Sequence, residues 1–161
     1  MTAENPIEAA AGLFHKAFEA QMGGDLTAAE ELYKRSILAF PTAEAHTFLG
    51  WTYSMRGQLD EAIAECHKAI GVDPDFGNPY NDIGAYLLEQ GNVDAAIPWL
   101  EKAKTARRYE PRHYPYFNLG RAYLAKQMLS RALVEFEGAL AVQPQFAAAA
   151  KAIAALKRKL N

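Results

Sequence analysis

The sequence predicts an all-α protein built as an array of stacked helix pairs. The first observation behind this prediction is an apolar pattern that recurs around Gly50, Gly84 and Gly120, at intervals of 34 and 36 residues. The second is that each recurrence has helical spacing and is followed by a turn and another apolar stripe of helical period. A repeat of this length is typical of helix–turn–helix units that bury their apolar faces against one another.

The first helix of each repeat is marked by residues three and four positions apart, which lie on one face of a helix. Glycine inside a helix costs about 1 kcal/mol relative to alanine, so a recurring glycine predicts that a second helix approaches closely there. The small residues expected on that second helix are Ala62, Ala96 and Ala132. The marked positions are His46, Leu49, Gly50 and Tyr53, then Tyr80, Ile83, Gly84 and Leu87, then Tyr116, Leu119, Gly120 and Tyr123.

Short turns separate the two helices of each repeat. Gly57 and Gly91 suit the left-handed conformation that commonly ends a helix. Gln127 occupies the same place in the last repeat without that freedom, so this turn is expected to be the least ideal. Pro74 and Pro144 end their units, because proline cannot continue the preceding helix.

An earlier, degenerate unit precedes these repeats, and a capping helix follows them. Residues 24–37 align with the segment that begins at Gly57, and Leu13 and Ala17 conform to the first-helix pattern. A divergent end unit is expected, because one of its faces meets solvent. Apolar residues from 146 to 160 share one helix face. We expect one domain over residues 1–161, with units at approximately 10–42, 43–76, 77–112 and 113–144 and a capping helix at 145–160.

The Leu-Gly-x-x-Tyr pattern, the alanine on the second helix and the closing proline together resemble the signature of tetratricopeptide repeats. This resemblance implies a right-handed α-α superhelix. It also implies a non-enzymatic scaffold or adaptor whose concave groove binds a peptide or helix of another protein. The alternative is a structural scaffold that self-associates through its groove or its open end. A nucleic-acid-binding helical repeat ranks lower, because the sequence pI is near 6.1.

The family resemblance also implies which residues form the groove. In this family the first helix of each repeat lines the concave face. Aromatic residues with a nearby arginine have the composition of binding hot spots, although these rings could instead pack on neighbouring units. The expected partner-binding residues are Phe14, Phe18, Thr47, Trp51, Asn81, Tyr114, Phe117 and Arg121.

One ligand class of the family is not expected here. Its co-chaperone members grip the carboxylate tails of heat-shock chaperones with lysine, asparagine and arginine. Two alignment frames of this chain lack the cations, and Asp82 would repel a carboxylate. The residues at the clamp positions are Phe14, Phe18, Phe48, Asn78 and Asp82 in one frame and Thr47, Trp51, Asp82, Tyr114 and Asn118 in the other.

A basic segment lies where two extra residues separate the third and fourth units. Residues 101–112 contain five basic and two acidic side chains, in a chain of net charge −2. One interpretation is a solvated helix end whose cations complement the helix dipole. The other is a docking site for an acidic partner, formed by Arg107, Arg108 and Arg112.

The sequence contains none of the common catalytic or phosphate-binding motifs, so no enzymatic activity, cofactor or metal is expected. Cys66 is the only cysteine and stands where the sister repeats have Leu100 and Phe136, which predicts a buried thiol. No apolar run approaches the roughly 20 residues of a membrane span, so no membrane association is expected. The start of the chain lacks the pattern of a signal peptide, and a cytoplasmic location is expected.

Overall fold

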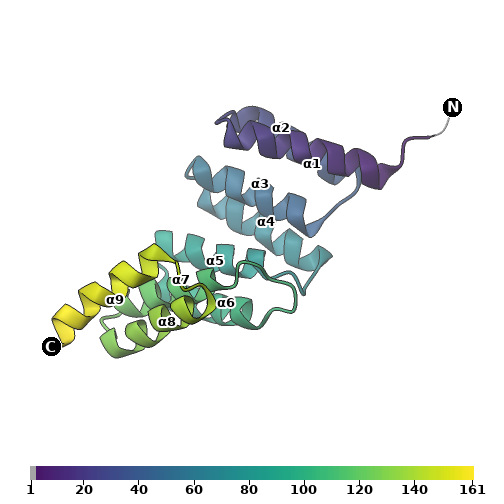
Figure 1. Cartoon of the computed structure of the whole chain (residues 1–161). Coiled ribbons are helices and arrows are strands. Elements are labelled where there is room, and N and C mark those ends of the chain that lie inside the picture. The colour runs from purple at the N-terminus through teal and green to yellow at the C-terminus, as the bar shows by residue number, and fades with distance from the viewer. Residues whose placement is uncertain (1–2) are drawn as a thin grey trace.

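The computed structural model describes residues 3–161, and these form helices joined by short connections, with no strand (Figure 1). This confirms the all-α repeat architecture that the sequence predicts. The helices are α1 (Pro6–Met22), α2 (Leu26–Ala39), α3 (Ala43–Met55), α4 (Leu59–Val72), α5 (Asn78–Glu89), α6 (Val93–Thr105), α7 (His113–Ala125), α8 (Leu129–Val142) and α9 (Ala147–Leu160).

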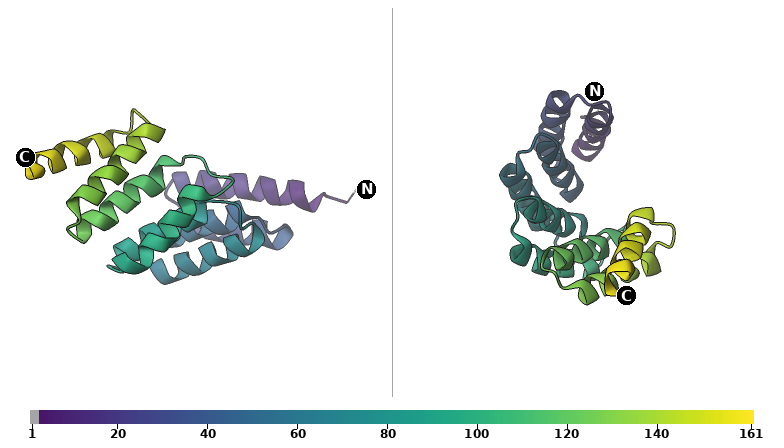
Figure 2. Two further views of the ribbon diagram at one scale, coloured as in Figure 1. Left: turned by 90° about the horizontal axis from the view of Figure 1, so that it is seen from below. Right: turned by 90° about the vertical axis from the view of Figure 1, so that its left-hand side faces the viewer.

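The helices pack as four successive hairpins, α1 with α2, α3 with α4, α5 with α6 and α7 with α8, and α9 covers α8. Figure 2 shows that the hairpins follow one another along a curved array with the two termini at its ends. The first helices of neighbouring hairpins also contact one another, α1 with α3, α3 with α5 and α5 with α7. Side chains from successive repeats therefore meet on α3, α5 and α7.

The glycine of each first helix lies against its partner helix. A Cβ atom placed on Gly84 would lie 2.4 Å from Cδ2 of Leu100, and one on Gly120 would lie 2.5 Å from Cε1 of Phe136. At Gly50 the nearest side-chain atom is Sγ of Cys66, at 3.5 Å. Cys66 is thus buried at the contact that Leu100 and Phe136 make in the later repeats, and this burial raises the pKa of its thiol well above the usual value.

The helix starts follow from local capping. The side chain of Asn5 accepts a hydrogen bond from the backbone of Ile7, and Pro6 occupies the first helical position. α1 therefore begins before residue 10, where the sequence places the first unit. Asp25 and Thr42 cap α2 and α3 in the same way.

The turn between α7 and α8 adopts the same left-handed geometry as the earlier turns. Gln127 has φ 61°, close to the 76° of Gly57 and the 81° of Gly91. The repeat geometry therefore imposes on a glutamine a conformation that L-residues other than glycine disfavour by roughly 1–2 kcal/mol. The sequence correctly identified this turn as the least ideal one.

The connection between α6 and α7 is bound to the preceding repeat. The backbone N–H of Gly77 donates to the carbonyl of Arg108 over 2.9 Å, and the N–H of Arg108 donates to the carbonyl of Asp75 over 2.9 Å. The guanidinium of Arg108 pairs with Asp73 at 2.7 Å and with Glu44 at 2.8 Å. Arg108 therefore ties this connection to α3 and to the end of α4.

The other two arginines of the basic segment differ from each other. Arg112 donates to the carbonyls of Lys104 and Ala106 over 2.8 and 2.9 Å and so satisfies the C-terminal end of α6. Arg107 is exposed and forms no ion pair within residues 3–161. Two of the three arginines expected on a docking surface thus make intramolecular contacts that hold the fold.

We predict that Gln127→Gly raises the free energy of unfolding by about 0.5–1 kcal/mol, because glycine adopts the left-handed conformation without strain. Urea unfolding followed by circular dichroism measures the change. Gly91→Ala, the matched reverse substitution, should lower stability by a similar amount. Equal stability of Gln127→Gly and the natural protein would show that this turn carries no strain.

We also predict that Arg108→Glu lowers the free energy of unfolding by about 1 kcal/mol, since a glutamate there would face Glu44 and Asp73 in place of pairing with them. Arg107→Glu is the control and should change stability by less than about 0.5 kcal/mol. Thermal unfolding of the two variants at low and moderate salt checks this. Indistinguishable melting curves would mean that the ion pairs do not hold the connection.

Candidate functional site

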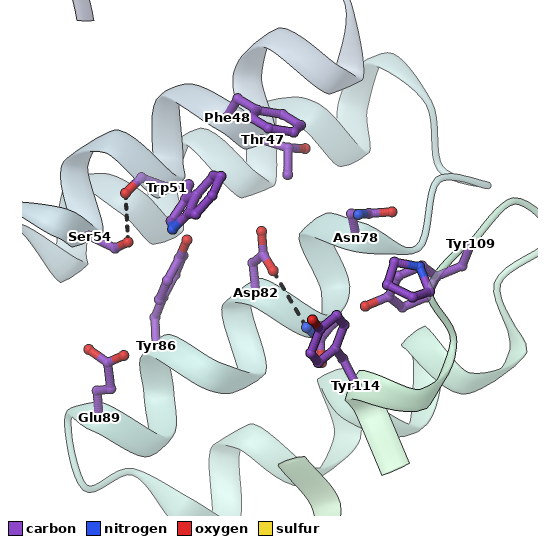
Figure 3. A pocket seen from close by; sticks show the side chains of 12 residues that line it. Thr47, Phe48, Trp51, Ser54, Asn78, Asp82, Tyr86, Glu89, Tyr109 and Tyr114 are labelled. Carbon is purple, nitrogen blue, oxygen red and sulfur yellow. Dashed lines mark hydrogen bonds between the residues drawn. The ribbon is translucent and has the colours of Figure 1, made fainter. Parts of the chain in front are cut away.

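A pocket of about 320 Å³ opens between α3, α5 and the connection from α6 to α7 (Figure 3). It is the surface where the first helices of two successive repeats meet, and the start of α7 closes one side. α3 contributes Thr47, Phe48, Trp51 and Ser54, α5 contributes Asn78, Asn81, Asp82, Tyr86 and Glu89, the connection contributes Tyr109 and Pro111, and α7 contributes Tyr114.

Helical spacing explains why these residues converge. On α5, Asn78, Asp82 and Tyr86 follow one another at four-residue steps, so one helix face presents all three. On α3, Thr47 and Trp51 are also four residues apart. Each helix thus directs one stripe of polar and aromatic side chains toward the other helix. This stripe is separate from the one that packs within the helix's own hairpin.

Aromatic rings form part of the pocket wall, from Phe48, Trp51, Tyr86, Tyr109 and Tyr114. Trp51 is 38% exposed, and its ring packs edge-on against Phe48 with 5.8 Å between ring centroids. Phe48 in turn contacts Phe14 and Phe18, at 5.3 and 5.8 Å. Phe14 and Phe18 therefore belong to a half-buried aromatic cluster behind the pocket and do not line it.

Three tyrosines complete the wall. Tyr86 and Tyr109 are buried, and burial raises the pKa of each phenol far above its usual value. Both therefore remain neutral at physiological pH. Tyr114 is 42% exposed at the rim and contacts Phe146 with ring centroids 5.8 Å apart.

A carboxyl group lies among these rings. In Figure 3 the Asp82 side chain points into the space bordered by Trp51 and Tyr86. Its one hydrogen bond is long, 3.5 Å from Nδ2 of Asn81. Burial among the surrounding side chains raises the pKa of Asp82 from 3.8 to about 7.

A chain of amides continues from the pocket along α7. Asn118 donates from Nδ2 to Oδ1 of Asn81 over 2.9 Å, and Arg121 donates from Nη1 to Oδ1 of Asn118 over 3.0 Å. Asn81 is only 7% exposed, and the oxygen of its amide accepts the hydrogen bond from Asn118. Arg121 is exposed, and its contact with Asn118 holds the guanidinium outside the pocket.

Four of the eight residues expected in the groove line the pocket: Thr47, Trp51, Asn81 and Tyr114. Thr47 is buried and donates its hydroxyl to the carbonyl of Ala43 over 2.7 Å, so it shapes the wall without offering a free donor. Phe117 lies outside the pocket and packs against Phe136 and Phe146, with centroids 5.5 and 5.1 Å away.

The sequence did not identify Asp82, Tyr86 and Tyr109 as partner-binding residues. Asp82 and Tyr86 share a helix face with Asn78, so extending the helical spacing along α5 would have found them. Tyr109 reaches the pocket only because its backbone neighbours pair with the α4–α5 turn, which no local sequence pattern indicates.

Within residues 3–161 no three His, Cys, Asp or Glu side chains are grouped as a metal ion would need. None of the helices there combines the length and apolar character required to cross a bilayer.

Solved structures with the same fold come from several systems. PilF of Pseudomonas aeruginosa superposes with a TM-score of 0.90 at 23% identity, over 97% of this chain and 71% of that one. MamA superposes with a TM-score of 0.75 at 23% identity, over 94% of this chain and 82% of that one. The first repeat domain of RPAP3, bound to the HSP90 peptide SRMEEVD, gives 0.69 at 22% identity, over 74% and 95% of the two chains.

Family models identify the family from the sequence itself. Two models, each described as tetratricopeptide repeat, match residues 19–79 and 80–108, which together make up more than half of the chain. The matched segments run from α1 through α6 and contain Gly50 and Gly84 with their partner helices. The chain belongs to the tetratricopeptide-repeat family.

Proposed function

We propose that the protein is an adaptor that binds a segment of another protein along α3, α5 and α7, with side chains of that segment anchored in the pocket. The observation that carries this proposal is the pocket itself, which is built by the first helices of successive repeats and bordered by the exposed rings of Trp51 and Tyr114.

The size and lining of the pocket support a protein ligand. A volume of about 320 Å³ is at the lower end of the range for small-molecule sites, so it suits one or two side chains of a longer ligand. Tryptophan and tyrosine are enriched among the residues that dominate binding energy at protein interfaces. Trp51 presents such a ring without being needed at the close helix contact of Gly50.

The fold supports the same class of function. The RPAP3 domain, which shares it, is bound to the peptide SRMEEVD. Asp82 and Glu89 would repel the acidic end of such a peptide, so we infer a ligand of different charge for this groove. A free, buried Cys66 is also compatible with a reducing compartment such as the cytoplasm.

Docking of an acidic partner at Arg107, Arg108 and Arg112 has less support. Arg108 is neutralised by Asp73 and Glu44, and Arg112 is bound to backbone carbonyls. This leaves Arg107 as the one arginine of the three without such a contact within residues 3–161.

We predict that peptides selected from a random displayed library bind the natural protein and lose about 2 kcal/mol of binding free energy when Trp51 is changed to alanine. Isothermal titration calorimetry on individual peptides measures the loss. Leu38→Ala is the matched control, since Leu38 is an 87% exposed apolar residue on α2, remote from the pocket, and its truncation should leave binding unchanged.

Two results would contradict this proposal. One is a selection that yields no binder, or only binders indifferent to Trp51→Ala in a correctly folded variant. The other is a concentration-dependent dimer, seen by light scattering, that Trp51→Ala abolishes. That dimer would show that the groove holds a second copy of the chain and would favour a self-associating scaffold.

A further inference from the structure

We propose that the pocket receives a cationic side chain, lysine or arginine, of the bound segment, with the Asp82 carboxylate as its counter-ion and the surrounding rings as its walls. This inference rests on the proposed function, because it specifies the chemistry of the ligand in the same groove. It follows from three independent features of the pocket: an unpaired carboxylate, a second unmet acceptor and an aromatic wall.

The carboxylate of Asp82 has no cationic partner. No ion pair within residues 3–161 includes it. The arginines on the neighbouring elements are occupied elsewhere, Arg112 by backbone carbonyls and Arg121 by the amide of Asn118. Asp82 is half-buried, and charges that are partly removed from water are normally paired, because desolvation without compensation is costly. A partner that brings a cation would supply the missing charge.

A second acceptor in the pocket also lacks a donor. The Oδ1 atom of Asn78 is buried and has no hydrogen-bond partner in the described chain. Asn78 lies one helical turn before Asp82 on the same face of α5, and both line the pocket. An ammonium group carries three donors and a guanidinium five, and neither carries an acceptor. Such a group can satisfy the Asp82 carboxylate, whereas a carboxylate ligand cannot, and the unmet acceptor of Asn78 marks the same face of α5 as polar.

The aromatic wall favours the same ligand. Aromatic faces attract cations, and the attraction is stronger in desolvated sites. The protein already uses this contact, with Arg108 4.3 Å from the ring centroid of Phe76 and Lys102 4.8 Å from that of Trp99. In the pocket, Figure 3 shows the rings of Trp51 and Tyr86 beside Asp82. Glu89 adds a second negative charge at the rim.

We predict that Asp82→Asn stabilises the unbound protein at pH 8. The folded state raises the pKa of Asp82 from 3.8 to about 7, so folding favours the protonated form and stability falls as the pH rises between these values. Other titratable groups around the carboxyl are Cys66, Tyr86 and Tyr109, whose pKa values are raised above their usual values, and Glu89 and Tyr114 at the rim.

The variant removes that cost and keeps the acceptor that Asn81 contacts. Its thermal midpoint should rise by about 3–6 °C at pH 8 and much less at pH 5. Asp75→Asn is the matched control, because Asp75 is exposed and its side chain accepts no hydrogen bond in the described chain. An Asp82→Asn variant that is less stable at pH 8 would show that contacts within the protein already stabilise the carboxylate and that it does not lack a counter-ion.

Binding provides the decisive experiment. Among peptides that bind the natural protein and depend on Trp51, we expect one lysine or arginine to recur at a fixed position. Asp82→Asn should weaken these peptides at least tenfold, and so should glutamine in place of the basic residue of the peptide. The two changes made together should cost little more than either alone. Asp75→Asn, which alters net charge equally, should leave affinity unchanged.

The outcomes separate this inference from the proposed function. Peptides that require Trp51 but contain no recurring basic residue, or that bind Asp82→Asn as tightly as the natural protein, would overturn the cation proposal and leave the groove intact. A selection without any Trp51-dependent binder would overturn both. Independent, additive losses in the double-variant measurement would also overturn direct pairing between Asp82 and the cation.

Discussion

The close approach of two helices at a glycine is the contact on which this architecture depends. Gly84 and Gly120 leave room for Leu100 and Phe136, and Gly50 lets the backbone carbonyl of Ala62 on α4 approach closely. Because each second helix packs onto the first at this point, one face of the first helix is committed to its own hairpin. The faces that remain contact the next repeat, and this stacking of α3, α5 and α7 creates the groove.

Long-range polar contacts then fix the details that the helix packing leaves open. Arg108 holds the connection between α6 and α7 against the preceding repeat, which brings Tyr109 to the pocket, and Arg112 binds carbonyls at the end of α6. The amides of Asn81 and Asn118 join α5 to α7 in a buried hydrogen bond. Such bonds are costly to leave unmade, so they favour one arrangement of neighbouring repeats over others.

How much the sequence predicts depends on the range of the interaction concerned. Helical spacing is local, so the helix pairs, the left-handed turns and the position of Cys66 could be read from single segments. Trp51 and Tyr114 were found through positions shared with a family. The role of Arg108 was missed because its partners lie in another repeat, which residue types do not reveal. Arg112 agrees with the helix-end interpretation, since it binds carbonyls at the end of α6. Phe117 is expected in the groove from its position, and in the structure its ring packs against Phe136 and against Phe146 of the capping segment, outside the pocket.

At the unpaired Asp82, the charge that we propose for binding lowers the stability of the unbound protein. A leucine or asparagine there would be compatible with the helix and would avoid desolvating a charge, yet the half-buried carboxylate stands among aromatic rings and forms no ion pair within residues 3–161. Local costs of this kind concentrate at sites that act on something outside the fold. The RPAP3 domain shares this architecture and is bound to the peptide SRMEEVD, whereas the pocket here is lined by Asp82 and Glu89, so we infer that the fold leaves the choice of ligand charge open. That choice rests with the few side chains that successive first helices direct into the groove, and here those side chains favour a cation.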